Sequence, residues 1–204
     1  MSLLLVLEFA AALGGALMAG LYFAFSVAVM TALARIAPAS GMAAMQSINV
    51  VILNPWFFLA FFGTAAICAV LAVMALLRWS EPGAALLLLA CALYLVGNIV
   101  VTMIFNVPLN NALAAADPAS TGGAALWSRY LSTWTAWNHV RTLSCLASLA
   151  LLIGAIYVQG KAAAQPPLHF RPERLRLRHP GVADGDNACL PRGYGDHDGP
   201  RAIG

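Results

Sequence analysis

The sequence predicts an all-α integral membrane protein: a four-helix transmembrane bundle with extracytoplasmic loop helices and a disordered C-terminal tail. Of its 204 residues, 61% are hydrophobic and only 9% are charged, whereas soluble domains carry about 25% charged residues. Four apolar runs also reach the roughly 20 residues that a helix needs to cross a bilayer. These runs lie at about 4–30, 55–77, 84–105 and 137–157.

Each run has boundaries that fit a spanning helix. The first lacks a basic stretch at its start and continues to about Met30, which favours a retained helix over a cleaved signal peptide. Pro55 stands near the start of the second run, where the missing N–H of proline costs least. The third run follows the turn-forming residues 81–83, and the fourth closes at Gly160. Residues 1–160 are therefore expected to form the membrane domain.

The character of the chain changes in residues 161–204, which are rich in proline, arginine and glycine. Such a segment cannot bury an apolar core, so we expect it to be disordered. Its basic residues, together with Arg78, outnumber those on the opposite side of the membrane. By the positive-inside rule both termini then lie in the cytoplasm, in a bacterial-type inner membrane or a plasma membrane. The net charge of +3 forms no soluble basic patch that predicts nucleic-acid binding.

The two longer loops, about 31–54 and 106–136, should face outward together. Residues 40–53 have helical apolar spacing and are expected on the membrane surface, and 109–116 also read as a helix. Residues 124–136 place Trp127, Tyr130, Leu131 and Trp134 on one helical face. Since tryptophan and tyrosine concentrate at membrane interfaces, we expect this face to lie there.

Polar side chains gather at the outer ends of these helices. Asn98, Thr102 and Asn106 recur every four residues and share one stripe of the third helix. Asn138 and Arg141 share a face of the fourth helix. Polar groups near lipid need partners, so we expect the stripes to converge in a pocket that opens outward. The candidate site residues are Asn54, Asn98, Thr102, Asn106, Asn110, Trp134, Trp137, Asn138, His139 and Arg141.

Each of these residues also has a purely structural interpretation. His139, the one histidine outside the tail, is a candidate acid or base but can also bond a backbone carbonyl. Arg141 offers a rigid fork of donors but also suits the head-group layer. The asparagines can simply fasten helices together. The four cysteines show no metal-ligand spacing, so no metal site is expected, and no common catalytic motif is present.

Three motifs carry a family resemblance. The run from Asn106 to Asn111, the run from Trp134 to Arg141, and the pair Asn54-Pro55 resemble the anthrone oxygenase-like (DUF1772) family of small four-helix membrane proteins. The resemblance covers about residues 5–158. It implies oxidation of a hydrophobic polycyclic anthrone, or a quinone-like substrate, by molecular oxygen, without a metal or flavin cofactor.

The residues permit this chemistry. An anthrone carries an acidic C–H beside an aromatic ketone, and loss of that proton gives an electron-rich enolate that reacts with oxygen. As a hypothesis, His139 is the base, and Arg141 with Asn138 or Asn106 donates to the developing oxyanion. The remaining residues would contact the substrate, with two tryptophans forming a flat slot: Asn54, Asn98, Thr102, Asn110, Trp134 and Trp137.

Two other functions stay open at this point, as do catalysis itself and a homo-oligomeric state. A non-catalytic protein that binds a lipid or a partner subunit would use the polar cluster only to hold helices together. A small proton-coupled transporter would use Glu8, the one acid within an apolar run. Glu8 is expected close to the cytoplasmic interface, far from the outer cluster, which counts against transport.

Overall fold

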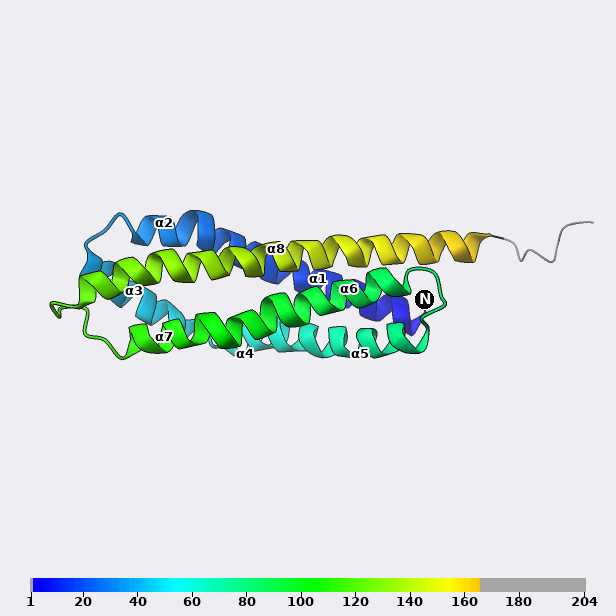
Figure 1. Ribbon diagram of the computed structural model, residues 1–204, viewed down its shortest axis with the longest axis horizontal. Coiled ribbons are helices and arrows are strands. Elements are labelled where there is room, and N and C mark those ends of the chain that lie inside the picture. Colours follow the sequence, from blue (N-terminus) through cyan, green and yellow to red (C-terminus); the bar gives the residue numbers. More distant parts are fainter. Residues whose placement is uncertain (1, 166–204) are drawn as a thin grey trace, which may run out of the picture. The chain divides into compact units, whose positions relative to one another are not determined.

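The computed structural model describes residues 2–165, so nearly all of the predicted tail, 161–204, lies outside the described residues (Figure 1). Residues 2–165 form helices and turns without a strand. Several helices contain wider π-helical segments, which are labelled η. In chain order the elements are α1 (Leu3–Ala24), η1 (Phe25–Val29), α2 (Met30–Leu33), α3 (Pro38–Val51), α4 (Pro55–Phe58), η2 (Leu59–Gly63), α5 (Thr64–Leu77), α6 (Ala84–Tyr94), η3 (Leu95–Val100), η4 (Thr102–Asn106), α7 (Val107–Ala114) and α8 (Gly123–Ala164).

Four continuous helices within residues 2–165 are long and apolar enough to cross a membrane, which confirms the predicted fold class. They run over Leu3–Leu33, Pro55–Leu77, Ala84–Ala114 and Gly123–Ala164. The last two are longer than the sequence suggested, because the expected loop helices 109–116 and 124–136 continue them. The third helix passes Pro108 through the π-helical turn η4, where the N–H of Val107 donates to the carbonyl of Thr102.

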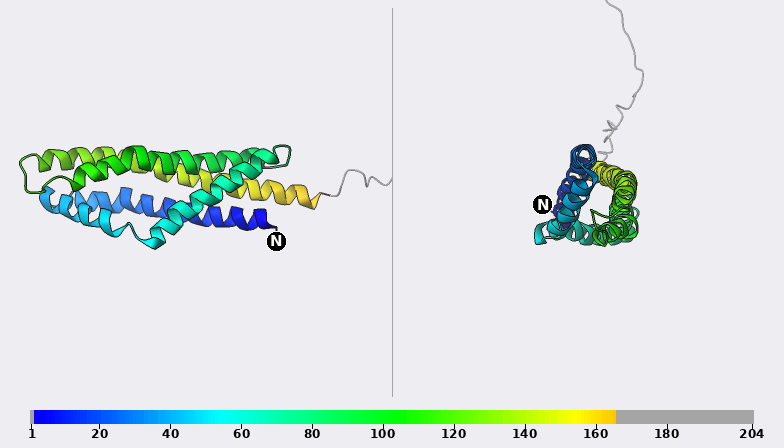
Figure 2. Two further views of the ribbon diagram at one scale, coloured as in Figure 1. Left: turned by 90° about the horizontal axis from the view of Figure 1, so that it is seen from below. Right: turned by 90° about the vertical axis from the view of Figure 1, so that its left-hand side faces the viewer.

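The four helices form a closed ring. α1 packs on α5 and α8, and α6 packs on the same two neighbours. The end-on view in Figure 2 shows the resulting square. The N-terminal end of α1 and the α5–α6 turn lie at one end of the bundle (Figure 1). The core inside the ring includes Met18, Leu71, Leu87, Tyr94 and Leu152, and many outward side chains are apolar, as a lipid environment requires.

Glycine lets two of these helices approach closely. A Cβ atom added at Gly14 of α1 would overlap the hydroxyl of Thr64, at the start of α5. Gly20, on the same helix, has no such neighbour. Small residues at helix contacts are the usual means of packing in lipid, where burial of apolar surface gives no gain.

We expect Gly14→Val to lower the stability of the detergent-solubilised protein by about 1–3 kcal/mol, because overpacking forces the helices apart. Gly20→Val places the same side chain in open space and is the matched control. Thermal unfolding followed by circular dichroism measures both. Equal melting temperatures for the two variants would contradict the close α1–α5 contact.

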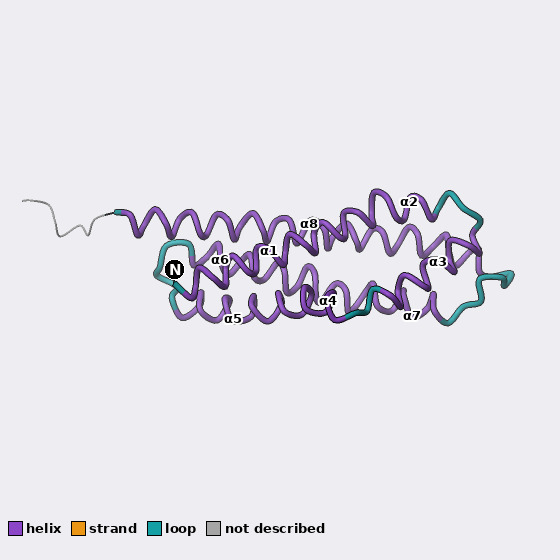
Figure 3. Tube along the Cα trace, turned by 180° about the vertical axis from the view of Figure 1, so that it is seen from behind, coloured by secondary structure: helices purple, strands orange, loops and turns teal. Residues whose placement is uncertain are grey.

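A cap closes the end of the bundle away from the α5–α6 turn. There α3 and α7 pack against each other and against the first turns of α8 (Figure 3). Gln46 of α3 fixes this contact by donating to the carbonyls of Leu113 at 2.8 Å and Ala116 at 3.0 Å. The cap is filled by Met30, Met42, Met45, Leu113, Trp127, Tyr130 and Trp134, all buried.

The structure of the cap differs from two predictions made from the sequence. Residues 40–53 were expected on the membrane surface, but Met42 and Met45 of α3 point into the cap. The aromatic face of 124–136 was expected at the interface, but Trp127 and Tyr130 are buried and stack on each other. Both segments are apolar on one helical face, and that pattern is the same whether the face meets lipid or another helix.

Candidate functional site

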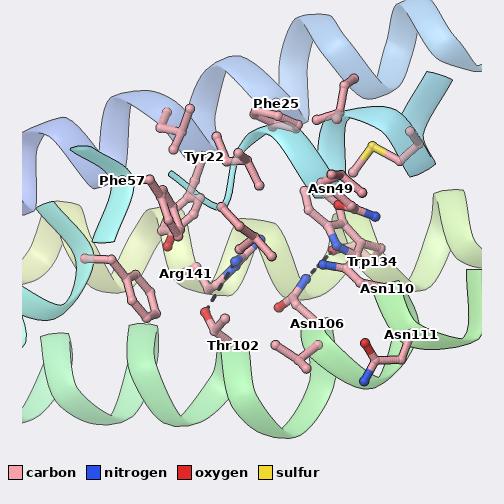
Figure 4. Close-up of a pocket in the computed structure, with 18 of the residues that line it drawn as sticks. Tyr22, Phe25, Asn49, Phe57, Thr102, Asn106, Asn110, Asn111, Trp134 and Arg141 are labelled. Carbon is pink, nitrogen blue, oxygen red and sulfur yellow. Dashed lines mark hydrogen bonds between the residues drawn. The ribbon is translucent and has the colours of Figure 1, made fainter. Parts of the chain in front are cut away.

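A pocket of about 420 Å³ lies beneath the cap, between all four spanning helices and α3 (Figure 4). Its walls are largely aromatic, and its polar groups come mostly from α3, the third helix and α8. The aromatic residues are Tyr22, Phe25, Phe57, Phe58, Phe61, Phe62 and Trp134. The polar residues are Gln46, Asn49, Thr102, Asn106, Asn110, Asn111 and Arg141.

Three π-helical segments contribute side chains to this pocket. Phe25 comes from η1, Phe61 and Phe62 come from η2, and Thr102 and Asn106 come from η4. A π-helical turn adds one residue to the turn and re-aims the side chains around it, and such turns are frequent at functional sites. The first three spanning helices therefore all depart from regular α-helix at the level of the pocket.

Arg141 is the central polar group. Its side chain is 5% exposed, and its guanidinium donates to Asn138 Oδ1 at 2.6 Å and Thr102 Oγ1 at 3.3 Å. The same guanidinium lies over the ring of Tyr22, 4.2 Å from its centroid, and 5.2 Å from that of Trp134. Aromatic faces attract a cation, so the rings and the hydrogen bonds fix the position of the charge.

No carboxylate neutralises Arg141 within residues 2–165. Of the three acids there, Glu8 accepts a hydrogen bond from Gln159, and Asp117 accepts one from the N–H of Ala119. Glu81 lies in the turn before α6, at the other end of the bundle. A buried charge is normally paired. The pocket thus presents an uncompensated positive charge that an anionic ligand would balance.

Asn138 holds this charge in place from behind. Its Nδ2 donates to the carbonyl of Tyr22 and to Ser26 Oγ, both at 2.7 Å, while its Oδ1 accepts from Arg141. One buried asparagine therefore joins α8 to the first spanning helix and orients the guanidinium. Three of its hydrogen-bonding positions are used, so it is a fixed part of the scaffold.

Three buried polar atoms of the pocket walls have no hydrogen-bond partner among the described residues: Arg141 Nε, Trp134 Nε1 and Asn106 Oδ1. The first two are donors and the third is an acceptor. Buried polar groups nearly always have partners. Figure 4 shows Trp134, Asn106 and Arg141 facing the same space from two helices. The pocket can therefore accommodate a ligand oxygen that accepts hydrogen bonds, beside a group that donates one.

The structure brings five of the sequence-predicted residues to the pocket wall, and places Asn138 directly behind them. The five are Thr102, Asn106, Asn110, Trp134 and Arg141. Asn110 accepts a hydrogen bond from the hydroxyl of Tyr130 at 2.8 Å, which connects the pocket wall to the cap.

The other predicted residues lie outside the pocket. Asn54 caps α4 by accepting from the N–H groups of Trp56 and Phe57. Asn98 is buried and accepts from the hydroxyl of Tyr22 at 2.8 Å, and Trp137 stacks on Phe105. These contacts give each residue a structural role of its own.

His139 is not part of the pocket either. Its side chain is exposed and borders a separate shallow groove between the first helix and α8, together with Ser26 and Arg35. His139 and Arg141 are two positions apart, and this spacing turns the two side chains to nearly opposite faces of one helix. The structure thus gives no support for His139 as a base acting on a ligand beside Arg141.

Glu8 was expected close to the cytoplasmic interface and far from the outer cluster. Its side chain is fully buried among the helices, with Oε1 accepting from Gln159 Nε2 at 2.7 Å. Glu8 lies near the start of α1, whereas the pocket lies beneath the cap at the other end of the bundle. The acid and the pocket are therefore separate features.

Sequence reasoning missed most of the aromatic wall. Tyr22 and Phe25 lie in a long apolar run and carry no distinguishing spacing. The second helix did hold a signal, since four phenylalanines occur within residues 57–62, and all four line the pocket. Gln46 and Asn49 were overlooked because α3 was expected to lie on the membrane surface.

The fold and the site define a class of protein: a helical membrane protein with an aromatic pocket around a buried arginine. Residues 56–151 match the family model described as anthrone oxygenase, which confirms the resemblance at the level of the family. This segment includes Thr102, Asn106, Trp134 and Arg141. A search of curated proteins and a search of solved structures each found no match.

Proposed function

We propose that this protein is a membrane-embedded oxygenase that oxidises a flat aromatic ketone of the anthrone type with molecular oxygen. The family match supports an oxygenase-like membrane protein, and the substrate and the reaction are our proposal. The observation that carries it is the buried guanidinium of Arg141, which has no carboxylate partner in residues 2–165 and lies in an aromatic pocket.

The reaction requires the stabilisation of an oxyanion. Loss of a proton from the methylene group of an anthrone gives an enolate whose negative charge rests largely on oxygen. The enolate carbon adds oxygen to form a hydroperoxide, which loses water to give the quinone. One O₂ is consumed, and one water is formed, for each methylene group converted to a carbonyl.

The pocket suits this enolate in shape and charge. Arg141 and the free Nε1–H of Trp134 would donate to the enolate oxygen, and Asn106 Oδ1 would accept from a hydroxyl group next to it. The aromatic rings of Tyr22 and the four phenylalanines of the second helix would enclose the flat ring system. Donors aimed at a developing charge in a water-poor site are the strongest single source of catalysis in such reactions.

The proton itself is proposed to leave to a water molecule held in the pocket. The described residues that line the pocket include no histidine or carboxylate. Arg141 would instead favour the enolate electrostatically, so that a weak base suffices. This replaces the assignment of His139 as the base.

The same absence of a base among those residues favours a second candidate function, non-catalytic binding of a weakly acidic aromatic molecule that enters neutral and is held beside Arg141. Both functions use Arg141, and turnover separates them. Proton-coupled transport receives no comparable support, because Glu8 is bonded to Gln159 away from the pocket. We also propose that both termini face the cytoplasm, which places the capped end of the bundle outside.

The test is oxygen uptake by purified protein in nanodiscs supplied with anthrone. We expect protein-dependent uptake of one O₂ for each quinone formed. The matched control is 10,10-dimethylanthrone, which has the same ring system but no acidic C–H, and should bind without consuming oxygen. Anthrone that binds but oxidises only at its spontaneous rate would favour the binding protein.

We expect His139→Ala to retain turnover within about twofold of the wild type, because substitutions away from a site usually change little. The pH–rate profile should also be unchanged, with the rate rising as pH favours the enolate. Oxygen uptake between pH 5 and pH 8, about the range in which histidine titrates, measures both. A turnover loss of about a hundredfold or more, as expected for removal of a general base, would restore His139 as that base.

A further inference from the structure

The pocket has no open path along the axis of the bundle towards the capped end. Above it, α3, α7 and α8 pack around a core that includes Met42, Leu113 and Tyr130, each almost completely buried. Gln46 ties α3 to the end of α7 with two hydrogen bonds. A ligand arriving from the water on that side would have to separate this packed layer.

The side of the pocket between the second and third helices is different. At the far end of these helices α5 packs closely on α6. At the level of the pocket, by contrast, α4 and η2 make no comparable contact with η4 or α7 among the described elements. The two helices therefore diverge from their common turn towards the cap, and the pocket lies where they are apart.

Apolar side chains border this gap. Of the seven exposed residues that line the pocket, six are apolar: Val50, Leu53, Phe58, Phe62, Met103 and Ala114. The seventh is Asn111 of α7. The polar groups Arg141 and Asn106 are buried further in. The pocket thus changes from a mostly apolar mouth to a polar floor, which is the order a ligand leaving hydrocarbon would meet.

The depth of the mouth agrees with this arrangement. Phe62 is 15 residues before Leu77, and Met103 is 19 residues after Ala84. At about 1.5 Å per residue these side chains lie about 22 to 29 Å from the α5–α6 turn. The hydrocarbon layer is about 30 Å thick, so the mouth lies within it, near its outer edge. Trp56, 81% exposed, marks the interface just beyond.

We propose that the pocket takes its ligand sideways from the hydrocarbon of the bilayer, through the gap between the second and third helices that Phe58, Phe62 and Met103 border. The identity of the ligand rests on the proposed function, but the route does not. The substrate is then a molecule that partitions into the membrane as a neutral species and meets its counter-charge, Arg141, only inside. A charged, water-soluble aromatic acid would be excluded.

A kinetic experiment tests the route. Anthrone binding to protein in nanodiscs, measured under nitrogen so that no oxidation occurs, gives the association and dissociation rates. We expect Met103→Trp to slow both rates by about tenfold or more while the Kd stays within about threefold, because a narrowed mouth obstructs both directions equally. Leu143→Trp, on a lipid-facing position of α8 that is 67% exposed, is the matched control and should change neither.

Unchanged rates in Met103→Trp, or equal slowing in Leu143→Trp, would overturn the lateral route. Failure of the wild type to bind anthrone would instead refute the proposed function. In that case the route is decided without a substrate, in a protein that keeps Trp134 and carries phenylalanine at its other four tryptophans. A nitroxide dissolved in the hydrocarbon, 10-doxylnonane, should quench Trp134 fluorescence, and aqueous iodide should not. Quenching by iodide, or by neither agent, would overturn the proposal.

Discussion

Replacing Arg141 with glutamine is expected to reduce anthrone oxidation by about 10²- to 10³-fold, the usual effect of losing a donor to an oxyanion. The protein should nevertheless remain folded. Arg141 is a buried cation without a carboxylate partner among residues 2–165, and a neutral residue at such a position removes a desolvation cost. We therefore expect Arg141→Gln, which keeps an amide donor, to melt at the same temperature as the wild type or higher. Arg141→Met, with its similar volume, leaves Asn138 Oδ1 without its donor, so its loss should not exceed the cost of that one group, about 1–3 kcal/mol.

This combination of lost activity and retained stability is the diagnostic result. Replacing a residue that only holds helices together would lower activity and stability together. Oxygen uptake and thermal unfolding on the same preparation measure the two quantities. Arg141→Lys completes the series, because it keeps the charge but loses the rigid fork that contacts Asn138 and Thr102. We expect intermediate activity for it. Wild-type activity in Arg141→Met would refute a role for the charge in catalysis.

Replacing Asn138 with leucine is expected to have the opposite balance, with the largest loss of stability among the variants discussed. The change is close to isosteric, but it leaves the carbonyl of Tyr22, the hydroxyl of Ser26 and one nitrogen of Arg141 without their partner. Each abandoned buried group costs about 1–3 kcal/mol. We therefore expect the free energy of unfolding to fall by several kcal/mol, with a marked fall in the melting temperature.

The matched control is Thr142→Val, one turn further along α8. Its hydroxyl is also buried but donates only to the carbonyl of Asn138 within the same helix, at 2.9 Å. We expect this variant to lose no more than about 1 kcal/mol, the net value of one ordinary hydrogen bond. Equal melting temperatures for the two variants would mean that Asn138 does not join the helices.

The double variant Asn138→Leu/Arg141→Met provides a further check on the coupling of these two residues. If Asn138 chiefly supports the buried charge of Arg141, part of the destabilisation caused by Asn138→Leu disappears when Arg141 is also replaced. The combined destabilisation should then be smaller than that of Asn138→Leu alone, with a coupling of about 0.5–3 kcal/mol for residues in one network. If the free-energy changes of the two single variants simply add, the two residues are not energetically coupled.

Much of the architecture was predictable from the sequence because it depends on composition alone. Long uncharged runs determine spanning helices, since only a helix satisfies every backbone hydrogen bond within lipid. The stripe of Thr102 and Asn106 on the third helix, and of Arg141 on the fourth, followed from helical spacing for the same local reason. These three residues do line one pocket in the structure.

Tertiary packing decided which polar residues share the pocket. His139 and Arg141 are two positions apart in the sequence and both were candidates to meet a ligand, but only Arg141 faces the ring of Tyr22. Helical spacing predicts that the two side chains point in nearly opposite directions, but it does not predict which of them faces the neighbouring helices. In a chain whose outer surface is as apolar as its core, hydropathy does not separate lipid-facing from buried positions. The aromatic wall, the cap over it and the gap that opens to the bilayer were for this reason decided by the tertiary structure alone.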